Sequence, residues 1–270
     1  MSKHHLLRVS CSVVFIVMTI FLGLLSCEAQ EPIRLHFPAE APLNKRMCHG
    51  DLVFLKLHFK PGEELWFIVD TGAPKTLLDK SLEPRLGKIL GTKKIKASFY
   101  PDVVGHVYAA PQLYWNDVPL VTANRVTATD LSYMGYPFHP VSGVLGMDCL
   151  RHYCLQLDFP AGKIRLLDPD KSGGDDLGKS FHLAFHNGFY FGTVFTRADC
   201  FGFRGTVFAV DTGCSPDCFL VPKLFRQAFD EQKSIGNRSS KTADVLRFLE
   251  QHVVTFNFPK RTMFLKPVVP

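Results

Sequence analysis

The sequence carries two copies of the tripeptide Asp-Thr-Gly, and these are the residues best suited to do chemistry. Residues 70–72 follow the apolar run at 67–69, and residues 211–213 follow a similar run at 208–210. One Asp-Thr-Gly alone indicates little, because an Asp that caps a tight turn before a Gly explains it equally well. Two copies, each placed after an apolar strand-like run, predict instead that Asp70 and Asp211 act as a pair.

Two carboxyl groups held close together supply what hydrolysis by an activated water requires. They share one proton, because both cannot easily ionise at short range. The ionised partner removes a proton from water, and the protonated partner donates a hydrogen bond to the carbonyl of the bond that is cleaved. The groups titrate as a pair, so the sequence does not assign acid and base individually to Asp70 and Asp211.

The residues that follow each Asp are expected to shape the two catalytic loops. Gly72 and Gly213 allow the backbone to turn tightly and to approach the carboxyl groups. Thr71 and Thr212 carry hydroxyls that are able to hydrogen-bond across the junction of the two loops. We therefore expect these four residues to support the catalytic pair rather than to react.

The two motifs belong to a longer internal repeat. Residues 67–72 recur as 208–213, and residues 150–169 recur as 249–267. Each copy opens with a strand that runs into Asp-Thr-Gly and closes with a predicted β-hairpin, and we expect the turn of the second hairpin to be one residue shorter. Residues 171–176, rich in Gly, Ser and Asp, form the natural linker.

The repeat predicts two lobes, at residues 45–170 and 178–270, of which the second is reduced. Composition favours β structure, with 24 Phe, 20 Gly and 18 Pro in 270 residues. Helical periodicity is scarce, and the best short-helix candidates are 77–86 and 221–233. The predicted strands lie at 52–59, 65–69, 94–100, 106–109, 153–157 and 163–167.

Residues 67–73 (Phe-Ile-Val-Asp-Thr-Gly-Ala), residues 142–150 (Ser-Gly-Val-Leu-Gly-Met-Asp-Cys-Leu) and the closing hairpin resemble the retropepsin-like and pepsin-like aspartic peptidases. The resemblance covers residues 50–169 best. It implies an all-β, bilobal aspartic-peptidase-like β-barrel fold with a reduced second lobe, one active site at the lobe interface, and no cofactor. It also implies that Asp70 and Asp211 are catalytic and that Asp148 is structural.

The family covers its substrate with a β-hairpin flap, which by position falls within residues 94–109 of this chain. The resemblance makes Tyr100 or Tyr108 a candidate substrate-binding aromatic residue, although ordinary packing explains both tyrosines as well. The substrate is expected to be a polypeptide that binds in extended form and pairs with a flap strand.

Two departures from the family pattern keep other functions open. Cys214 stands where the family usually has Ser, Thr or Ala, and the second lobe has no counterpart of the Val-Leu-Gly segment at 144–146. We favour an aspartic endopeptidase that uses an intramolecular Asp70/Asp211 dyad and acts as a monomer. The alternatives are a homodimer in which two Asp70 residues pair, and a non-catalytic binding or scaffold protein.

The first 29 residues read as an export signal. Lys3 and Arg8 precede an uncharged apolar run at 9–27, which is typical of a secretory signal peptide. Cleavage after Ala29, lipid attachment at Cys27, and an uncleaved membrane anchor all stay open. Each of them places the rest of the chain outside the cytoplasm, as a periplasmic, secreted or membrane-anchored protein.

Cysteine spacing and net charge limit the other partners. Six cysteines follow the signal and would allow up to three disulfides in an oxidising compartment. A metal site is not expected, because the closest pair, Cys214 and Cys218, has no second Cys or His pair at ligand spacing. The net charge of +6 is modest and the basic residues are scattered, so nucleic acid is not an expected partner. The six cysteines are Cys48, Cys149, Cys154, Cys200, Cys214 and Cys218.

Overall fold

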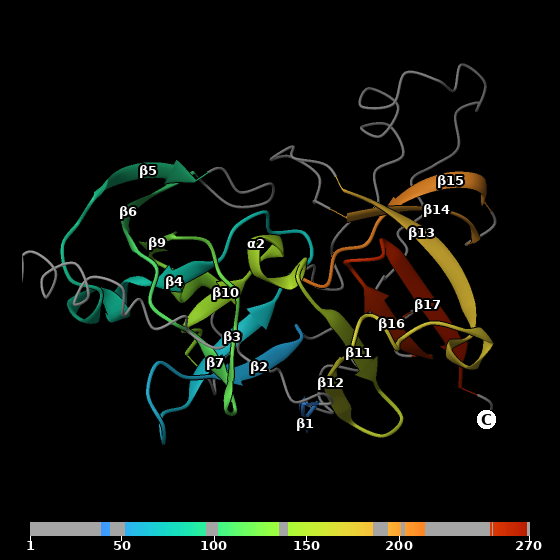
Figure 1. Ribbon diagram of the computed structural model, residues 1–270. Coiled ribbons are helices and arrows are strands. Elements are labelled where there is room, and N and C mark those ends of the chain that lie inside the picture. Colours follow the sequence, from blue (N-terminus) through green and yellow to red (C-terminus); the bar gives the residue numbers. More distant parts are fainter. Residues whose placement is uncertain are drawn as a thin grey trace, which may run out of the picture. The chain divides into compact units, whose positions relative to one another are not determined.

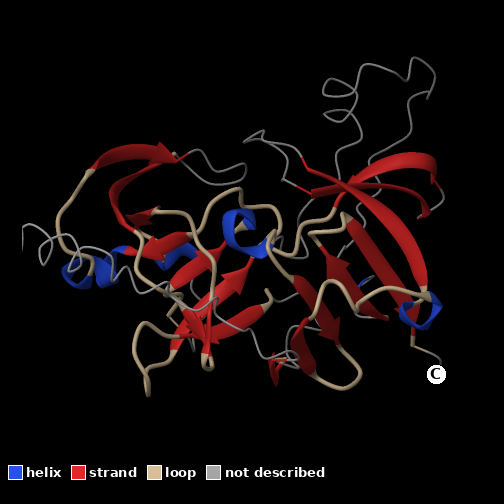
Figure 2. Ribbon diagram, viewed as in Figure 1, coloured by secondary structure: helices blue, strands red, loops and turns tan. Residues whose placement is uncertain are grey.

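The structure is a computed structural model that describes residues 39–43, 52–95, 102–134, 140–185, 194–200, 203–213, 249 and 251–268. Regular structure in these residues is almost entirely strand (Figures 1 and 2), so the prediction of an all-β protein is confirmed. The helical elements in the described residues are α2 (Met147–Leu150) and three short 3-10 helices, η2 (Lys80–Arg85), η3 (Ser132–Met134) and η4 (Asp175–Leu177), and Leu249 is also helical. None of the helices in the described part has the length and apolarity needed to cross a membrane. The predicted export signal lies outside the described residues.

The first repeat builds a seven-stranded sheet with the strand order β2-β3-β10-β4-β9-β6-β5. A separate two-stranded sheet joins β7 to β8. The strands are β2 (Phe54–Leu57), β3 (Leu65–Val69), β4 (Leu77–Asp79), β5 (Gly91–Ile95), β6 (Val103–Ala109), β7 (Tyr114–Trp115), β8 (Val118–Pro119), β9 (Arg125–Thr129) and β10 (Gly143–Leu145).

Strand β3 lies inside this sheet and leads into the first Asp-Thr-Gly. Phe67, Ile68 and Val69 are fully buried, as expected for aromatic and β-branched residues in a strand that is covered on both faces. Strand β10 runs parallel to β3, with Leu145 opposite Val69, and antiparallel to β4. The chain therefore places residues 143–145 beside the end of β3, although they lie far away in sequence.

The closing hairpins of the two repeats meet in an eight-stranded sheet with the order β1-β12-β11-β16-β17-β13-β14-β15. Strands β11 and β16 pair antiparallel, with Gln156 opposite Thr255, and the Gln156 amide donates to Thr255 Oγ1 over 3.0 Å. This pairing joins the two repeats into one sheet. The strands are β1 (Ala39–Pro42), β11 (Cys154–Asp158), β12 (Lys163–Leu167), β13 (Lys179–Phe185), β14 (Val194–Cys200), β15 (Phe203–Ala209), β16 (His252–Asn257) and β17 (Thr262–Pro267).

The two closing hairpins turn in the same way. Asp158 Oδ1 accepts the Ala161 N–H over 3.0 Å, and Asn257 Oδ1 accepts the Lys260 N–H over 3.2 Å. The last pairs of the two ladders, Asp158 with Lys163 and Asn257 with Thr262, enclose turns of equal length. The expected shortening of the second turn is therefore wrong, and the second copy loses its residue outside the turn.

The structure also corrects the helix expected at 77–86. Residues 77–79 form strand β4 because Leu77 and Leu78 pair with both β10 and β9. Only Lys80–Arg85 is helical, as a 3-10 helix capped by Asp79, which accepts the Ser81 N–H over 2.9 Å. The other expected helix, 221–233, lies outside the described residues.

The β-barrel expectation fails for the described strands. The seven-stranded sheet has a linear order that ends at β2 and β5, and the eight-stranded sheet ends at β1 and β15, so neither sheet closes on itself. All described residues fall within one compact unit that spans residues 36–270. The predicted lobe boundaries at 170 and 178 fall between β12 and β13, inside a sheet that both repeats share.

Replacing Leu157 with Ala tests the junction of the two repeats. Leu157 is fully buried in β11 and lies opposite Val254 of β16, so the truncation leaves a cavity that we expect to cost about 2–5 kcal/mol of unfolding free energy. Urea unfolding followed by circular dichroism measures the loss. The matched control is Leu90→Ala, because Leu90 is 49% exposed and should cost about 0.5 kcal/mol or less. Equal losses in the two variants would contradict the assignment of this junction to the core.

Candidate active site

Both Asp-Thr-Gly loops leave equivalent strands of the two repeats. The Val69 N–H donates to the Val53 carbonyl over 2.8 Å, and the Val210 N–H donates to the Val194 carbonyl over the same distance. Asp70 follows the first of these bonds and Asp211 the second. The repeat in the sequence is therefore also a repeat in hydrogen bonding at the entry to each loop.

The two loops are joined by four hydrogen bonds made by Thr71 and Thr212. Thr71 Oγ1 donates to the Val210 carbonyl over 2.5 Å and accepts the Thr212 N–H over 3.0 Å. Thr212 Oγ1 donates to the Val69 carbonyl over 2.7 Å and accepts the Thr71 N–H over 3.1 Å. Both threonines are fully buried. Each hydroxyl thus satisfies a buried donor and a buried acceptor of the other repeat, as buried polar groups require.

Backbone amides hold the two carboxyl groups in place. Asp70 Oδ1 accepts the N–H groups of Gly72 and Ala73 over 2.7 and 2.9 Å. Asp211 Oδ1 accepts the Gly213 N–H over 2.9 Å. Any Cβ at Gly72 would collide with the Asp211 carboxyl, and any Cβ at Gly213 would collide with that of Asp70. Each carboxyl therefore packs against the Gly of the opposite loop, and a side chain at either position would displace the carboxyl that it faces.

The carboxyl groups of Asp70 and Asp211 share a hydrogen bond, and both have a raised pKa. Burial raises the pKa of Asp70 well above its ordinary value, and the charge and hydrogen bond of Asp211 raise it further. Burial also raises the pKa of Asp211, while hydrogen bonds from Asp70 and from the backbone N–H groups of Gly213 and Gly72 oppose that rise. The electrostatics therefore favour a pair that keeps one proton between its two members.

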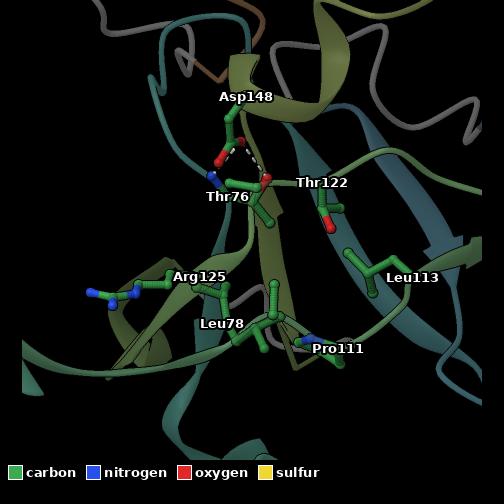
Figure 3. Close-up of a pocket in the computed structure, with 10 residues that line it drawn as sticks. Thr76, Leu78, Pro111, Leu113, Thr122, Arg125 and Asp148 are labelled. Atoms are coloured by element: carbon green, nitrogen blue, oxygen red, sulfur yellow. Dashed lines mark hydrogen bonds between the residues drawn. The ribbon is translucent and has the colours of Figure 1, made fainter. Parts of the chain in front are cut away.

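A second set of bonds fixes the far end of the first loop (Figure 3). The N–H and the hydroxyl of Thr76 both donate to Asp148 Oδ1 over 2.8 Å. Thr76 Oγ1 in turn accepts the Gly146 N–H over 3.2 Å. The Met147 N–H donates to the Ala73 carbonyl over 2.8 Å. Asp148 therefore ties the segment after β10 to the first Asp-Thr-Gly loop, which fits the structural role expected for it.

A small hollow lies beside this network, lined mainly by apolar side chains that include Leu78, Pro111 and Leu113 (Figure 3). Neither Asp70 nor Asp211 contributes to its wall. Among the residues that the structure describes, no three His, Cys, Asp or Glu side chains gather closely enough to hold a metal ion.

The structure brings six of the predicted site residues together and separates Tyr108 from them. Asp70, Thr71, Gly72, Asp211, Thr212 and Gly213 form one cluster. Tyr108 lies in β6 with 2% of its surface exposed. Burial raises its pKa, and the nearby carboxylate of Glu83 raises it further. This burial favours packing over substrate contact for Tyr108. Tyr100 lies outside the described residues, so its role stays a prediction.

The described cysteines take no part in the predicted disulfides. Cys149 and Cys154 are free and buried. Burial raises the pKa of both thiols, to about 11 for Cys154, so neither is a reactive thiolate near neutral pH. Disulfides among the other four cysteines stay a prediction, because their side chains lie outside the described part of the chain.

Sequence reasoning missed two supports of the first loop. Thr76 carries the bonds to Asp148 and Gly146, yet nothing in the sequence marks this threonine apart from its place after the first motif. The Leu145 carbonyl accepts the Asp70 N–H over 3.1 Å, a backbone contact that no side-chain pattern reveals. The Val-Leu-Gly segment was the available signal for this second support, because it places Leu145 beside the loop.

Comparison with known proteins adds little to this geometry. No known protein family matches the sequence, and no curated protein matches it. Among solved structures, basic 7S globulin from soybean matches with 14% sequence identity and a TM-score of 0.33 over 56% of each chain. The matched region thus spans little more than half of that protein, and a likeness this distant carries no argument about fold or function.

Replacing Thr71 with Val tests the bonds between the loops. Valine keeps the shape but leaves the Val210 carbonyl and the Thr212 N–H buried without a partner, so we expect a loss of about 2–4 kcal/mol. Thermal and urea unfolding measure it. Thr92→Val serves as the control, because Thr92 is exposed in β5 and should change stability by about 0.5 kcal/mol or less. A Thr71 variant as stable as this control would show that the cross-loop bonds contribute nothing.

The raised pKa values predict the sign of a pH dependence. The folded Asp70/Asp211 pair holds protons that the unfolded chain releases, so its contribution to stability falls as pH rises above the unfolded value near 4. Asp70→Asn removes one charge of the pair. The variant should therefore gain stability relative to the wild type as pH rises from about 4 to 7, measured as the difference in Tm.

Replacing Asp168 with Asn provides a control in which the pH dependence of the Tm difference should have the opposite sign. The Asp170 N–H, its main hydrogen-bond donor, lowers the pKa of Asp168, so the stabilisation by this carboxylate is present at neutral pH and lost as pH falls through the lowered value. The Tm difference for Asp168→Asn should not follow the trend of Asp70→Asn. Parallel trends for the two variants would rule out a raised pKa at the Asp70/Asp211 pair.

Proposed function

We propose that this protein is an aspartic endopeptidase that hydrolyses peptide bonds with a water activated by Asp70 and Asp211. The observation that carries the proposal is the mutual packing of the two carboxyl groups, each held by backbone N–H groups and set against the Gly of the opposite loop. The proposal includes a bilobal aspartic-peptidase-like fold with a reduced second lobe.

The proposed reaction needs only the pair and one water. The ionised carboxylate removes a proton from the water, and the oxygen attacks the peptide carbonyl carbon. The protonated carboxyl donates a hydrogen bond to the carbonyl oxygen as it gains charge. The tetrahedral intermediate then collapses when the C–N bond breaks, and the leaving nitrogen receives a proton from the pair. The shared proton that burial and charge repulsion favour is the starting state of this cycle.

The contacts of Thr71 support an intramolecular pair over an Asp70 homodimer. Its hydroxyl and its N–H are both bonded to residues of the second repeat, Val210 and Thr212. A homodimer through Asp70 would have to break these buried bonds. We therefore propose that the protein acts as a monomer on a polypeptide substrate, without a cofactor and without nucleic acid.

The proposed location is outside the cytoplasm, on the strength of the first 29 residues. Free secretion and attachment to a membrane, through a lipid on Cys27 or through an uncleaved anchor, are both compatible with this proposal. The chemistry of the site does not depend on which applies.

Cleavage of a denatured protein mixture between pH 3 and 8 tests the proposal. We expect the purified full-length chain to cleave and both Asp70→Asn and Asp211→Asn to lose at least about 1,000-fold in kcat/KM, because removing either carboxyl breaks the shared-proton pair. Asp117→Asn, an exposed residue in the β7–β8 turn, is the control and should keep full activity. Mass spectrometry of the products measures the cleavage by the wild type and by each of the three variants.

The pattern of losses separates the alternatives. Activity that survives Asp211→Asn but not Asp70→Asn would indicate the Asp70 homodimer instead. A folded wild-type chain that cleaves nothing over the whole pH range would overturn the proposal in favour of a binding or scaffold protein.

A further inference from the structure

Lys75 is an exposed cation on the loop that carries Asp70. The Ala73 N–H donates to Asp70 Oδ1. Lys75 follows Ala73 by two residues, so the Cα atoms of Ala73 and Lys75 lie within about 8 Å of each other. The side chain of Lys75 is exposed, while its neighbour Thr76 is buried. An exposed charged side chain therefore lies five residues after Asp70 in the sequence.

The backbone of Lys75 is fixed from both sides. On one side Pro74 restricts the chain, because its ring locks φ. On the other side Thr76 is held by two hydrogen bonds to Asp148. Gly146 packs directly on the Lys75 carbonyl group, where any Cβ would approach within 2.6 Å. The base of the Lys75 side chain therefore has a defined position relative to Asp70, as a group that selects between ligands requires.

The Lys75 ammonium makes no ion pair with any residue that the structure describes. Asp148 is the anion bonded to the next residue, and its Oδ1 already accepts two hydrogen bonds from Thr76. Lys60 and Lys88 likewise make no ion pair with a described residue, whereas several other lysines of the first repeat are paired. Lys56 pairs with Glu64, Lys80 with Asp130 and Lys94 with Asp102.

We propose that Lys75 selects polypeptide substrates that carry an Asp or Glu side chain within about three residues of the cleaved bond. The proposal rests on the function proposed above. An extended chain advances about 3.3 Å per residue, so an acidic side chain within three residues of the cleaved bond lies within roughly 10 Å of the dyad. Lys75 is exposed on the loop that carries Asp70, so we expect its flexible side chain to meet a substrate in this range. At about 10 Å, one charge pair changes affinity by about twofold at the dielectric of bulk water and by more than about tenfold at that of a protein surface, so we expect an intermediate change of about fivefold.

Cleavage-site profiling tests the proposal on the active chain. A peptide library derived from a whole proteome is digested with the wild type, Lys75→Gln and Lys60→Gln, and the residues on both sides of each cleaved bond are counted by mass spectrometry. We expect Asp and Glu to be enriched about fivefold within three residues of the cleaved bond for the wild type and for Lys60→Gln. The enrichment should vanish in Lys75→Gln. Lys60 is the matched control, because it is exposed in the turn between β2 and β3, away from the Asp70 end of β3.

A binding measurement keeps the inference testable if the wild type cleaves nothing. In the Asp70→Asn background, fluorescence anisotropy compares the labelled peptide Ala-Ala-Glu-Phe-Phe-Glu-Ala-Ala with its Gln counterpart. We expect the Glu peptide to bind about fivefold more tightly, and the addition of Lys75→Gln to abolish the difference. Cleavage with an unchanged profile in Lys75→Gln, or equal binding of the two peptides in the Asp70→Asn chain, would overturn the role of Lys75. Absence of cleavage together with charge-dependent binding would overturn only the proposed function.

Discussion

Two acidic groups of like charge have to be held together against their own repulsion, and the rest of the site depends on how this is done. Four buried hydrogen bonds through Thr71 and Thr212 join the loops that carry Asp70 and Asp211. Each bond runs from one repeat to the other, so neither loop is complete without its partner. Because an unmade hydrogen bond in a buried position is costly, this arrangement tolerates little displacement of either loop.

Both sheets help to hold the two carboxyl groups together. In the first repeat, β10 inserts between β3 and β4 and places the Leu145 carbonyl at the Asp70 N–H. In the eight-stranded sheet, the pairing of β11 with β16 joins the closing hairpins of both repeats. The hairpins fix the repeats to each other, and the strands before each Asp direct the carboxyl groups to a common point.

Support of the first loop extends beyond the two Asp-Thr-Gly motifs. The first loop has Leu145, the Thr76–Asp148 bonds and the packing of Gly146 behind it. The described contacts of the second loop are the two threonine bridges, the Gly213 N–H and the Val194 carbonyl. The sequence also distinguishes the two repeats, because the Val-Leu-Gly segment at 144–146 has no counterpart in the second repeat. Rigid support on one side is also what gives Lys75 a fixed position near the pair.

Residue types and their spacing were enough to predict the β-rich class, the internal repeat and the six residues of the two Asp-Thr-Gly motifs. The sequence identified β3 and the first closing hairpin almost to the residue, since aromatic and β-branched runs bounded by Pro and Gly leave few alternatives. It failed at residues 77–79, where local periodicity indicated a helix but pairing with β9 and β10 made a strand. Only the tertiary structure decided that Tyr108 is buried, that Thr76 binds Asp148, and that each Gly faces the carboxyl of the opposite loop. Those contacts join residues tens of positions apart, and a local pattern holds no information on which distant partner a hydroxyl or a carbonyl will meet.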